Sequence, residues 1–338
     1  MKIFITGGAG FIGSNTAKRF IADGHEVVIF DNLSREGVEK NLDWLRGIGK
    51  YEFIKGDVTN YEELQKVFAE RKFDVVFHFA AQVAVTTSVA DPRSDFLNNI
   101  LGAFNLLESV RTSGQNPVVI YSSTNKVYGG MEEENIVLNG KRYELADYPE
   151  GVDEEYHLDF HSPYGCSKGA ADQYFHDYSR IYGLRTIVFR QSCIYGFRQF
   201  GKEDQGWVAW FIIAGLLNKP MTIYGDGFQV RDVLFIDDLV EAYVLAIKNI
   251  DKTAGKIYNL GGGADKTLSL VEFLEILEEK LGRKLGPGRS EPRAGDQKIY
   301  VSNVAKAGRD FGWAPKIAPQ AGIDLLFNWV KDNLHLFT

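Results

Sequence analysis

Hydrophobic residues fall in short runs, separated by longer stretches in which apolar and polar positions follow a helical spacing. The runs are rich in Val, Ile, Phe and Tyr, and they predict strands at residues 2–6, 26–30, 51–55, 74–80, 117–123, 185–190 and 256–261. Nearly every position in these runs is apolar, which is typical of strands covered on both faces, as in a parallel sheet.

The stretches between the runs predict amphipathic helices. Residues 60–71 and 98–111 place apolar side chains three and four positions apart, so that one face of each helix can pack on a sheet. Strands that alternate with helices predict right-handed crossovers. We therefore expect an α/β fold with a Rossmann-type, doubly wound parallel sheet.

The alternation loosens from about residue 192. Loop-rich segments at 196–207, 218–232 and 286–297 carry Arg, Gln and Gly. We interpret residues 1–191, with returns to the main sheet near 232–261, as an NAD-binding domain of the Rossmann type. Residues 192–338 are then mainly a smaller, substrate-binding domain, an arrangement that suits the length of the chain.

Composition narrows the possible partners. The chain of 338 residues is 45% hydrophobic and 25% charged, and its net charge of -7 argues against a nucleic-acid partner. No apolar run approaches the roughly 18 residues of a membrane span, and the N-terminal segment does not resemble a signal peptide. Two cysteines make no disulfide framework and six histidines form no ligand motif. We expect a cytoplasmic protein without a membrane partner and without a catalytic metal.

A glycine-rich turn follows the first strand and opens the next helix. Its glycines have the GxxGxxG spacing, which permits a tight turn and lets a diphosphate approach the N–H groups at the start of the helix. The pattern alone is weak, because a glycine turn at the end of a strand is often only a turn. The residues expected to hold the diphosphate are Gly7, Gly10, Phe11, Ile12 and Gly13.

An acidic residue, Asp31, ends the second strand. A carboxylate there can accept hydrogen bonds from an adenosine ribose and would repel a 2′-phosphate, so that NAD is preferred over NADP. Arg35 keeps NADP as an alternative, because a nearby guanidinium can hold the 2′-phosphate. Further cofactor contacts are expected near the strand ends, with the adenine bordered at residues 57 and 58. They are Asn32, Ser34, Arg35, Asp57, Val58, Phe79, Ala80, Ala81, Ser122 and Gln191.

Three residues suit proton transfer beside this cofactor. Tyr164 and Lys168 are one turn apart on a predicted helix, where the ammonium and the positive nicotinamide ring are both expected to lower the pKa of the phenol and make it a base. Thr124 follows a strand and can donate a hydrogen bond to a substrate oxygen. Each pattern alone also has a structural explanation; their order along the chain favours catalysis.

The strings TGGAGFIG, YSSTNKVYG and SPYGCSKGAADQY resemble the extended short-chain dehydrogenase/reductase family of nucleotide-sugar enzymes, over nearly the whole chain. Longer strings such as LDFHSPYGCSKGAADQY and DQGWVAWF resemble, more narrowly, the epimerases in it that invert C2 of a CDP-linked hexose. The resemblance implies a catalytic triad of Thr124, Tyr164 and Lys168, with NAD as cofactor. It also implies that Asn99 supports the cofactor site, holding an active-site water or the backbone.

The same resemblance implies that Arg231 and Arg293 clamp the nucleotide diphosphate, although surface ion pairs are the alternative for isolated arginines. Cys193 departs from the related UDP-galactose 4-epimerases, which have an asparagine that contacts the substrate phosphates there. Another residue of this chain must therefore contact the substrate phosphates.

Asn125 and Lys126 bear on the reaction. In the related 4,6-dehydratases an Asp-Glu pair follows the catalytic Thr and supplies the acid and base for loss of water. An amide cannot supply that acid, so we expect oxidation and re-reduction alone: hydride leaves the sugar for NAD and returns to the other face of the ketone. The assignment to C2 comes from the resemblance. A 4-epimerase, a dehydrogenase that releases NADH and a non-catalytic NAD-binding sensor are the alternatives.

The remaining predictions concern the sugar side and the assembly. The sugar is expected to meet the catalytic threonine and other polar side chains from several segments: Gln82, Thr86, Thr124, Asn125, Lys126, His161, Gln191, Cys193, Asp204 and Gln205. Lys126 can equally be a solvated loop residue. The predicted helices around residues 94–111 and 166–183 carry much apolar surface. In the resembled family such helices pair across a two-fold axis, which implies a homodimer or homotetramer.

Overall fold

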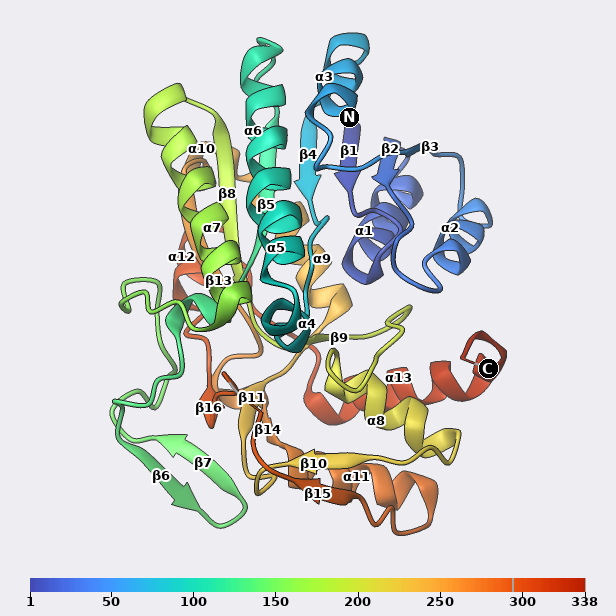
Figure 1. Cartoon of the computed structure of the whole chain (residues 1–338), viewed down its shortest axis with the longest axis vertical. Coiled ribbons are helices and arrows are strands. Elements are labelled where there is room, and N and C mark those ends of the chain that lie inside the picture. Colours follow the sequence, from blue (N-terminus) through green and yellow to red (C-terminus); the bar gives the residue numbers. More distant parts are fainter. Residues whose placement is uncertain (294, 338) are drawn as a thin grey trace.

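A single parallel sheet forms the centre of the computed structural model, which describes residues 1–293 and 295–337. Figure 1 shows the strands side by side with helices on both faces. Its strand order is β13-β8-β5-β4-β1-β2-β3 and all neighbours are parallel. The strands are β1 (Lys2–Thr6), β2 (Glu26–Asp31), β3 (Glu52–Lys55), β4 (Val75–His78), β5 (Val118–Thr124), β8 (Arg185–Gln191) and β13 (Lys256–Leu260). The predicted fold class is confirmed.

Alternate residues of each strand enter different cores, because successive side chains point to opposite faces. Ile3 and Ile5 pack into one cluster and Phe4 into the other. The first face is covered by α1 (Phe11–Ala22), α2 (Glu39–Arg46), α9 (Ile236–Lys248), α10 (Ile250–Thr253) and α12 (Ala305–Phe311). The second is covered by α3 (Tyr61–Glu70), α6 (Gly102–Thr112) and α7 (Ser162–Tyr182). The short helices α4 (Val85–Ala90) and α5 (Pro92–Phe96) pack against α7.

Smaller sheets and three helices form the lower part of the molecule in Figure 1. The helices are α8 (Trp207–Leu216), α11 (Leu270–Leu281) and α13 (Pro319–Asp332). Helix α11 begins with a capping box, in which the Ser269 hydroxyl accepts a hydrogen bond from the Glu272 N–H and the Glu272 carboxylate accepts one from the Ser269 N–H.

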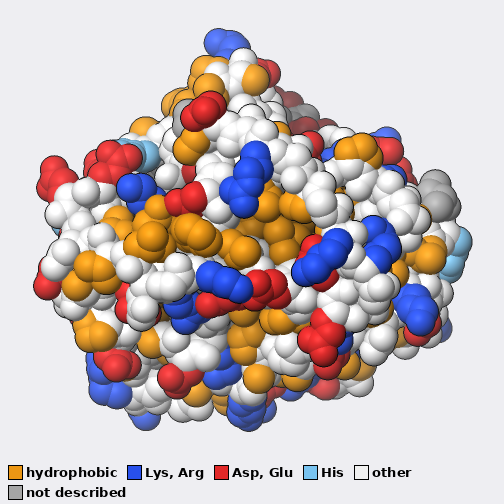
Figure 2. All heavy atoms as spheres, turned by 90° about the horizontal axis from the view of Figure 1, so that it is seen from below, with side chains coloured by type: hydrophobic (Ala, Val, Ile, Leu, Met, Phe, Trp, Pro, Cys, Tyr) orange, Lys and Arg blue, Asp and Glu red, His pale blue; other side chains and the backbone are white. Residues whose placement is uncertain are grey.

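The smaller sheets are built from short strands that are separate from the main sheet. They are β6 (Ile136–Asn139) with β7 (Arg142–Leu145), β9 (Ile194–Tyr195) with β12 (Leu234–Phe235), β10 (Thr222–Tyr224) with β15 (Gly288–Ser290), and β11 (Val230–Asp232) between β14 (Thr267–Ser269) and β16 (Ile299–Tyr300). Seen from below, hydrophobic side chains gather near the middle of the face, with positive and negative side chains interspersed around them (Figure 2).

The order of the strands determines where a ligand can enter. The chain runs outward from β1 through β2 to β3, then returns to the other side of β1 as β4. Loops at the carboxyl ends of β1 and β4 therefore separate and leave a crevice between them, the usual ligand position in open α/β sheets.

Candidate active site

A cavity of about 390 Å³ lies at the carboxyl edge of the sheet. It is bordered by the glycine turn after β1 and by the ends of β2, β4 and β5. Among the residues predicted to contact the cofactor, those that line it are Gly7, Gly10, Phe11, Ile12, Gly13, Asp31, Asn32, Ser34, Arg35, Val58, Phe79, Ala80, Ala81, Ser122, Tyr164, Lys168 and Gln191. We call it the cofactor cavity.

The glycine turn is packed too closely for side chains. A Cβ on Gly7, whose φ is +67°, would lie 2.5 Å from the Ala80 nitrogen, and a Cβ on Gly13 would lie 2.3 Å from the Gly7 oxygen. Helix α1 starts after Gly10 without a side-chain cap. Its first N–H groups therefore remain available for an anion such as a dinucleotide diphosphate.

Asp31 and Arg35 both line the cofactor cavity, but their side chains bond to different groups. The Asp31 carboxylate accepts hydrogen bonds from the N–H groups of Ala9 at 3.0 Å and Leu33 at 2.9 Å. Burial raises the pKa of Asp31, and these two hydrogen bonds oppose the rise. The Arg35 guanidinium donates to the Gln205 amide oxygen. A carboxylate in the cavity and an arginine already paired fit a ribose with free hydroxyls, as in NAD.

Two predicted cofactor residues lie behind the cavity wall. Asp57 accepts hydrogen bonds from Asn32 at 2.8 Å and from Thr59, so it orients a lining residue instead of lining the cavity itself. Asn99 is buried and exchanges hydrogen bonds with the Gln82 main chain at 2.8 and 3.0 Å. Both support the site from outside because their polar groups are used by neighbouring loops.

The predicted catalytic residues meet at the boundary of this cavity. Thr124 ends β5, while Tyr164 and Lys168 lie one turn apart in α7, and all three line the cavity. The Tyr164 N–H donates to the Ser88 hydroxyl at 3.1 Å, which anchors the start of the helix. The Lys168 ammonium donates to the Ser122 carbonyl oxygen at 2.5 Å and lies 4.3 Å from the centre of the Tyr121 ring.

The protonation state of this set differs from the expectation. Burial raises the pKa of Tyr164 to about 12, and only the neighbouring Thr124 hydroxyl opposes the rise. Burial likewise lowers the pKa of Lys168 to about 7, against the attraction of Asp172 and Asp95. In the protein without cofactor, Lys168 therefore does not bring the pKa of the phenol toward neutrality, and the lowering predicted with the nicotinamide ring stays a prediction. Removal from water disfavours the phenolate more strongly than its neighbours favour it.

Asp172 of α7 forms a buried ion pair with β8 and a hydrogen bond with β5. Asp172 receives the Arg190 guanidinium at 3.0 and 3.1 Å and also accepts a hydrogen bond from the Ser123 hydroxyl at 2.7 Å. Ser123 precedes Thr124, and Asp172 lies one turn beyond Lys168. The hydrogen bond between Ser123 and Asp172 thus links the strand and the helix that carry the predicted catalytic groups.

A second cavity of about 260 Å³ continues below the first and shares Asn125, Cys193 and Gln205 with it. We call it the substrate cavity. Most of the predicted substrate contacts line it: Thr86, Asn125, Lys126, Cys193, Asp204, Gln205, Arg231 and Arg293. Two do not. The Gln82 amide donates to the Ala84 oxygen and to Asp95, and His161 pairs with Asp159 at 2.9 Å.

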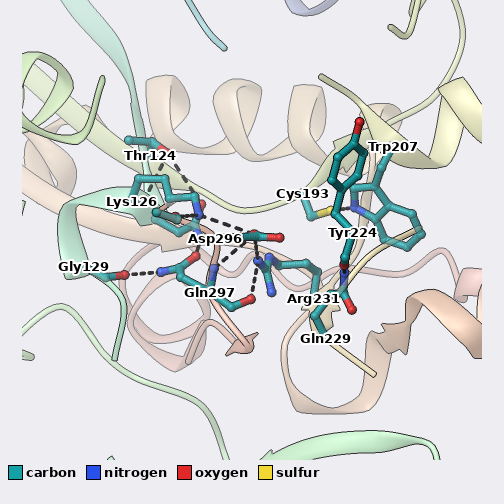
Figure 3. Close-up of polar contacts among 12 residues, drawn as sticks. Thr124, Lys126, Gly129, Cys193, Trp207, Tyr224, Gln229, Arg231, Asp296 and Gln297 are labelled. Carbon is teal, nitrogen blue, oxygen red and sulfur yellow. Dashed lines mark hydrogen bonds and ion pairs between the residues drawn. The ribbon is translucent and has the colours of Figure 1, made fainter. Parts of the chain in front are cut away.

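A cluster of charges lies on one wall of the substrate cavity (Figure 3). The Arg231 guanidinium donates to Asp296 at 2.8 Å and to the Gln297 carbonyl oxygen at 2.7 Å. The Lys126 ammonium donates to the Gly295 carbonyl oxygen at 3.1 Å. Burial, helped by Arg231, lowers the pKa of Lys126 to about 8, while Asp296 opposes the shift. Two cations on one wall provide an attractive site for a phosphate group.

Arg293 is held differently, because its guanidinium lies 3.8 Å from the centre of the Tyr224 ring and donates to the Glu203 carbonyl oxygen. Tyr224 was not among the predicted contacts, and neither were Trp207, Gln229 and Asp296, although all four line the cavity. The loop-rich segments at 196–207, 218–232 and 286–297 contain these four residues, but nothing in their spacing indicates which side chains point inward.

Cys193 takes a conformation that few residues adopt, with φ at +38°. Its sulfur accepts a hydrogen bond from the Trp207 indole N–H at 2.9 Å. Burial raises the pKa of the thiol to about 12, so that it stays protonated. Cys193 therefore shapes the passage between the two cavities and offers no reactive thiolate.

Among residues 1–293 and 295–337, no three His, Cys, Asp or Glu side chains are grouped to hold a metal ion. In the same part of the chain, no helix combines the length and apolar character that crossing a bilayer requires.

Comparison with known proteins agrees with this geometry. Residues 3–261 match the model of the NAD dependent epimerase/dehydratase family. The chain belongs to this family. It is 45% identical to the CDP-paratose 2-epimerase of Salmonella typhi, over 98% of this chain and 99% of the relative. The fold matches the structure of Thermotoga maritima UDP-glucose 4-epimerase with UDP-glucose at a TM-score of 0.85 and 32% identity, covering 99% of this chain and 100% of that one.

A further structure bears on the cofactor. The UDP-glucuronic acid 4-epimerase of Bacillus cereus, in complex with UDP-glucuronic acid and NAD, matches at a TM-score of 0.85 and 27% identity, over 98% of this chain and 99% of that one. The predicted family, NAD cofactor and epimerase class are confirmed: this family member is an NAD-dependent isomerase. When bound, NAD takes a hydrogen with its electron pair from a substrate carbon and gives it back.

Proposed function

We propose that this enzyme inverts C2 of a CDP-linked 3,6-dideoxyhexose, converting CDP-paratose to CDP-tyvelose. The observation that carries the proposal is the 45% identity to a CDP-paratose 2-epimerase over 98% of the chain. The relatives named UDP-glucose 4-epimerase are 33 and 34% identical over similar lengths, which makes 4-epimerisation the second candidate.

The residues beside Thr124 support chemistry without loss of water. Asn125 offers an amide, and its Nδ2 is already bonded to the Gln297 side chain at 3.0 Å. Lys126 is bonded to a main-chain oxygen. Neither side chain is a carboxylic acid that could protonate a departing hydroxyl, so dehydration of the oxidised sugar is disfavoured.

The catalytic residues have separate tasks in this proposal. Tyr164 takes the proton of the sugar hydroxyl at its phenol oxygen and later returns it, while Thr124 donates a hydrogen bond to the same sugar oxygen. Burial raises the pKa of Tyr164 to about 12 in the protein alone, so base action needs the positive charge of the bound oxidised cofactor. Arg231, Arg293 and Lys126 hold the nucleotide diphosphate while the oxidised sugar turns its other face.

Assembly into a homodimer or homotetramer is part of the proposal. The outer sides of α6 and α7 expose large apolar side chains: Phe104, Tyr174, Ile181 and Tyr182. A second copy of this surface could cover them across a two-fold axis. Sedimentation equilibrium measures the assembly, and a monomer at micromolar concentration would contradict this part.

A proton NMR time course tests the reaction. The purified enzyme is mixed with CDP-paratose in D₂O without added NAD. The expected result is the C2 epimer with no deuterium at C2 and no lasting absorbance of reduced nicotinamide. Deuterium at C2 would contradict the transfer of hydrogen through bound NAD. An inert CDP-paratose, together with C4 inversion of UDP-glucose, would favour the second candidate.

A further inference from the structure

A chain of buried amides lies beneath the substrate cavity. Gln297 is 1% exposed and does not line either cavity, yet its side chain contacts the residue next to Thr124. The Gln297 Nε2 donates to the Gly129 carbonyl oxygen at 2.5 Å. The Gln297 Oε1 accepts from the Asn125 Nδ2 at 3.0 Å. Nothing in the sequence pattern points to this residue.

These contacts determine which way each amide faces. A main-chain carbonyl can only accept, so the Gln297 side chain must turn its NH₂ toward Gly129 and its oxygen toward Asn125. Asn125 must then present its NH₂ to Gln297, which directs its own oxygen toward Thr124. The Thr124 hydroxyl donates to this oxygen at a long 3.5 Å and accepts from the Lys126 N–H at 3.2 Å. Gln297 therefore determines that the Asn125 oxygen faces the Thr124 hydroxyl, the group that must bind the substrate oxygen.

The main chain of the same residue reaches the substrate cavity. The Gln297 carbonyl oxygen accepts from the Arg231 guanidinium at 2.7 Å. The Gln297 N–H donates to Asp296 at 3.0 Å, and this carboxylate also binds Arg231. Gln297 thus contacts Arg231 through its backbone, and through its side chain it contacts Asn125 beside Thr124.

We infer that Gln297 is a positioning residue that orients the Asn125 amide beside Thr124 and joins this edge to Arg231. The inference rests on the proposed function. Because the Arg231 contact is made by the backbone, changing the side chain alone should disturb the catalytic step and leave binding of the nucleotide sugar nearly intact. This separation distinguishes a positioning role from a general loss of structure.

A double-mutant cycle with Gln297→Leu and Asn125→Leu tests the inference with CDP-paratose as substrate. Each single variant is expected to lower kcat by about 10- to 100-fold and to change KM by less than about 3-fold. The double variant should be no more than about 3-fold slower than the slower single variant, because both break the same chain of contacts. Gln297→Met, which fills a similar volume, takes the place of Gln297→Leu if that variant does not fold.

Gln115→Leu is the matched control. Like Gln297, Gln115 uses both ends of its side-chain amide, but its bonds among the described residues go to main-chain groups of Phe68, Arg71 and Phe73, and it lines neither cavity. Its kcat should equal that of the wild type even where thermal unfolding shows lost stability. Independent losses that multiply in the double variant, a loss carried by KM, or an unchanged kcat in Gln297→Leu would overturn the inference. If the wild type acts on UDP-glucose and not on CDP-paratose, the proposed function fails, and the same cycle with UDP-glucose still decides on Gln297.

Discussion

The two cavities are built on different principles. The cofactor cavity is formed largely by main chain and small side chains, at turns that follow consecutive strands of one sheet. The substrate cavity is formed by long polar and aromatic side chains from segments far apart in the chain, among them Lys126, Tyr224, Arg231 and Arg293. The cofactor cavity thus depends on backbone geometry, and the substrate cavity depends on side-chain contacts.

This difference has energetic consequences. A glycine turn cannot accept even a methyl group where a Cβ would meet backbone atoms, so the cofactor cavity is expected to be intolerant of small changes. Side chains in the substrate cavity are held by hydrogen bonds that can be removed one at a time. Changes there should weaken a binding or catalytic step without destroying the fold.

The largest effect is expected at the boundary of the two cavities. Tyr164→Phe removes the phenol oxygen and should lower kcat by about 10³-fold, because general acid–base catalysis typically contributes 10²–10⁴. Steady-state kinetics with CDP-paratose measures the loss, and the NAD content of the purified protein should not change. Tyr143→Phe is the control, since that hydroxyl pairs with Asp226 on an exposed hairpin. A kcat within 10-fold of the wild type would remove Tyr164 from the proposed role.

The next effect tests the backbone-built cavity. Gly7→Ala adds a Cβ that would lie 2.5 Å from the Ala80 nitrogen at a φ of +67°. The strain and the contact should cost about 1–3 kcal/mol and release most of the bound NAD. Cofactor content after denaturation measures this. Gly114→Ala is matched, because Gly114 has a φ of +69° and nothing within 4 Å. Equal NAD loss in both variants would mean that strain, and not the close approach, explains the result.

Arg231→Met tests the wall built from side chains. Loss of a charged donor to the diphosphate should raise KM about 10- to 100-fold with a smaller change in kcat. Initial rates over a range of CDP-paratose concentrations separate the two parameters. Arg180→Met should have no effect, since the pair of Arg180 with Asp177 is exposed on α7. A fall in kcat at constant KM would mean that Arg231 does not serve in binding.

The smallest effect concerns stability and pH. Burial lowers the pKa of Lys126 to about 8 from an ordinary value near 10.5. The folded state therefore binds fewer protons than the unfolded state between these values, so this lysine makes stability rise with pH in that window. Relative to Lys126→Met, the wild type should gain about 1–3 kcal/mol between pH 7.5 and 10. Urea unfolding at both pH values measures the gain. A constant difference would indicate an unshifted lysine.

Much of the cofactor cavity was predictable because its residues follow local patterns. A glycine turn after a strand and an acid at the end of the next strand occupy neighbouring positions in any doubly wound sheet. Asp57 and Asn99 show the limit of this reasoning, since both lie near the cavity but bond to other loops. Their place depends on which direction their side chains take at a strand end and within a helix.

The substrate cavity shows the opposite case. Tyr224, Gln229 and Asp296 lie in segments whose composition is that of ordinary loops, and only folding brings them to Arg231 and Lys126. Gln297 lies 172 positions after Asn125 in the chain and still sets the direction of its amide. No periodic signal marks such a contact.

The catalytic residues show the same contrast between what the sequence predicts and what the tertiary structure decides. The order Thr124, Tyr164, Lys168 along the chain is enough to predict a proton-transfer set, since residue type and helical spacing are local properties. Their pKa values depend on burial, which raises that of Tyr164 to about 12 and lowers that of Lys168 to about 7. The sequence determined the sheet, the glycine turn and the kind of chemistry, because these follow from short-range pattern. The tertiary structure alone decided the charge states and the substrate wall, because desolvation and side-chain direction arise only when distant segments pack together.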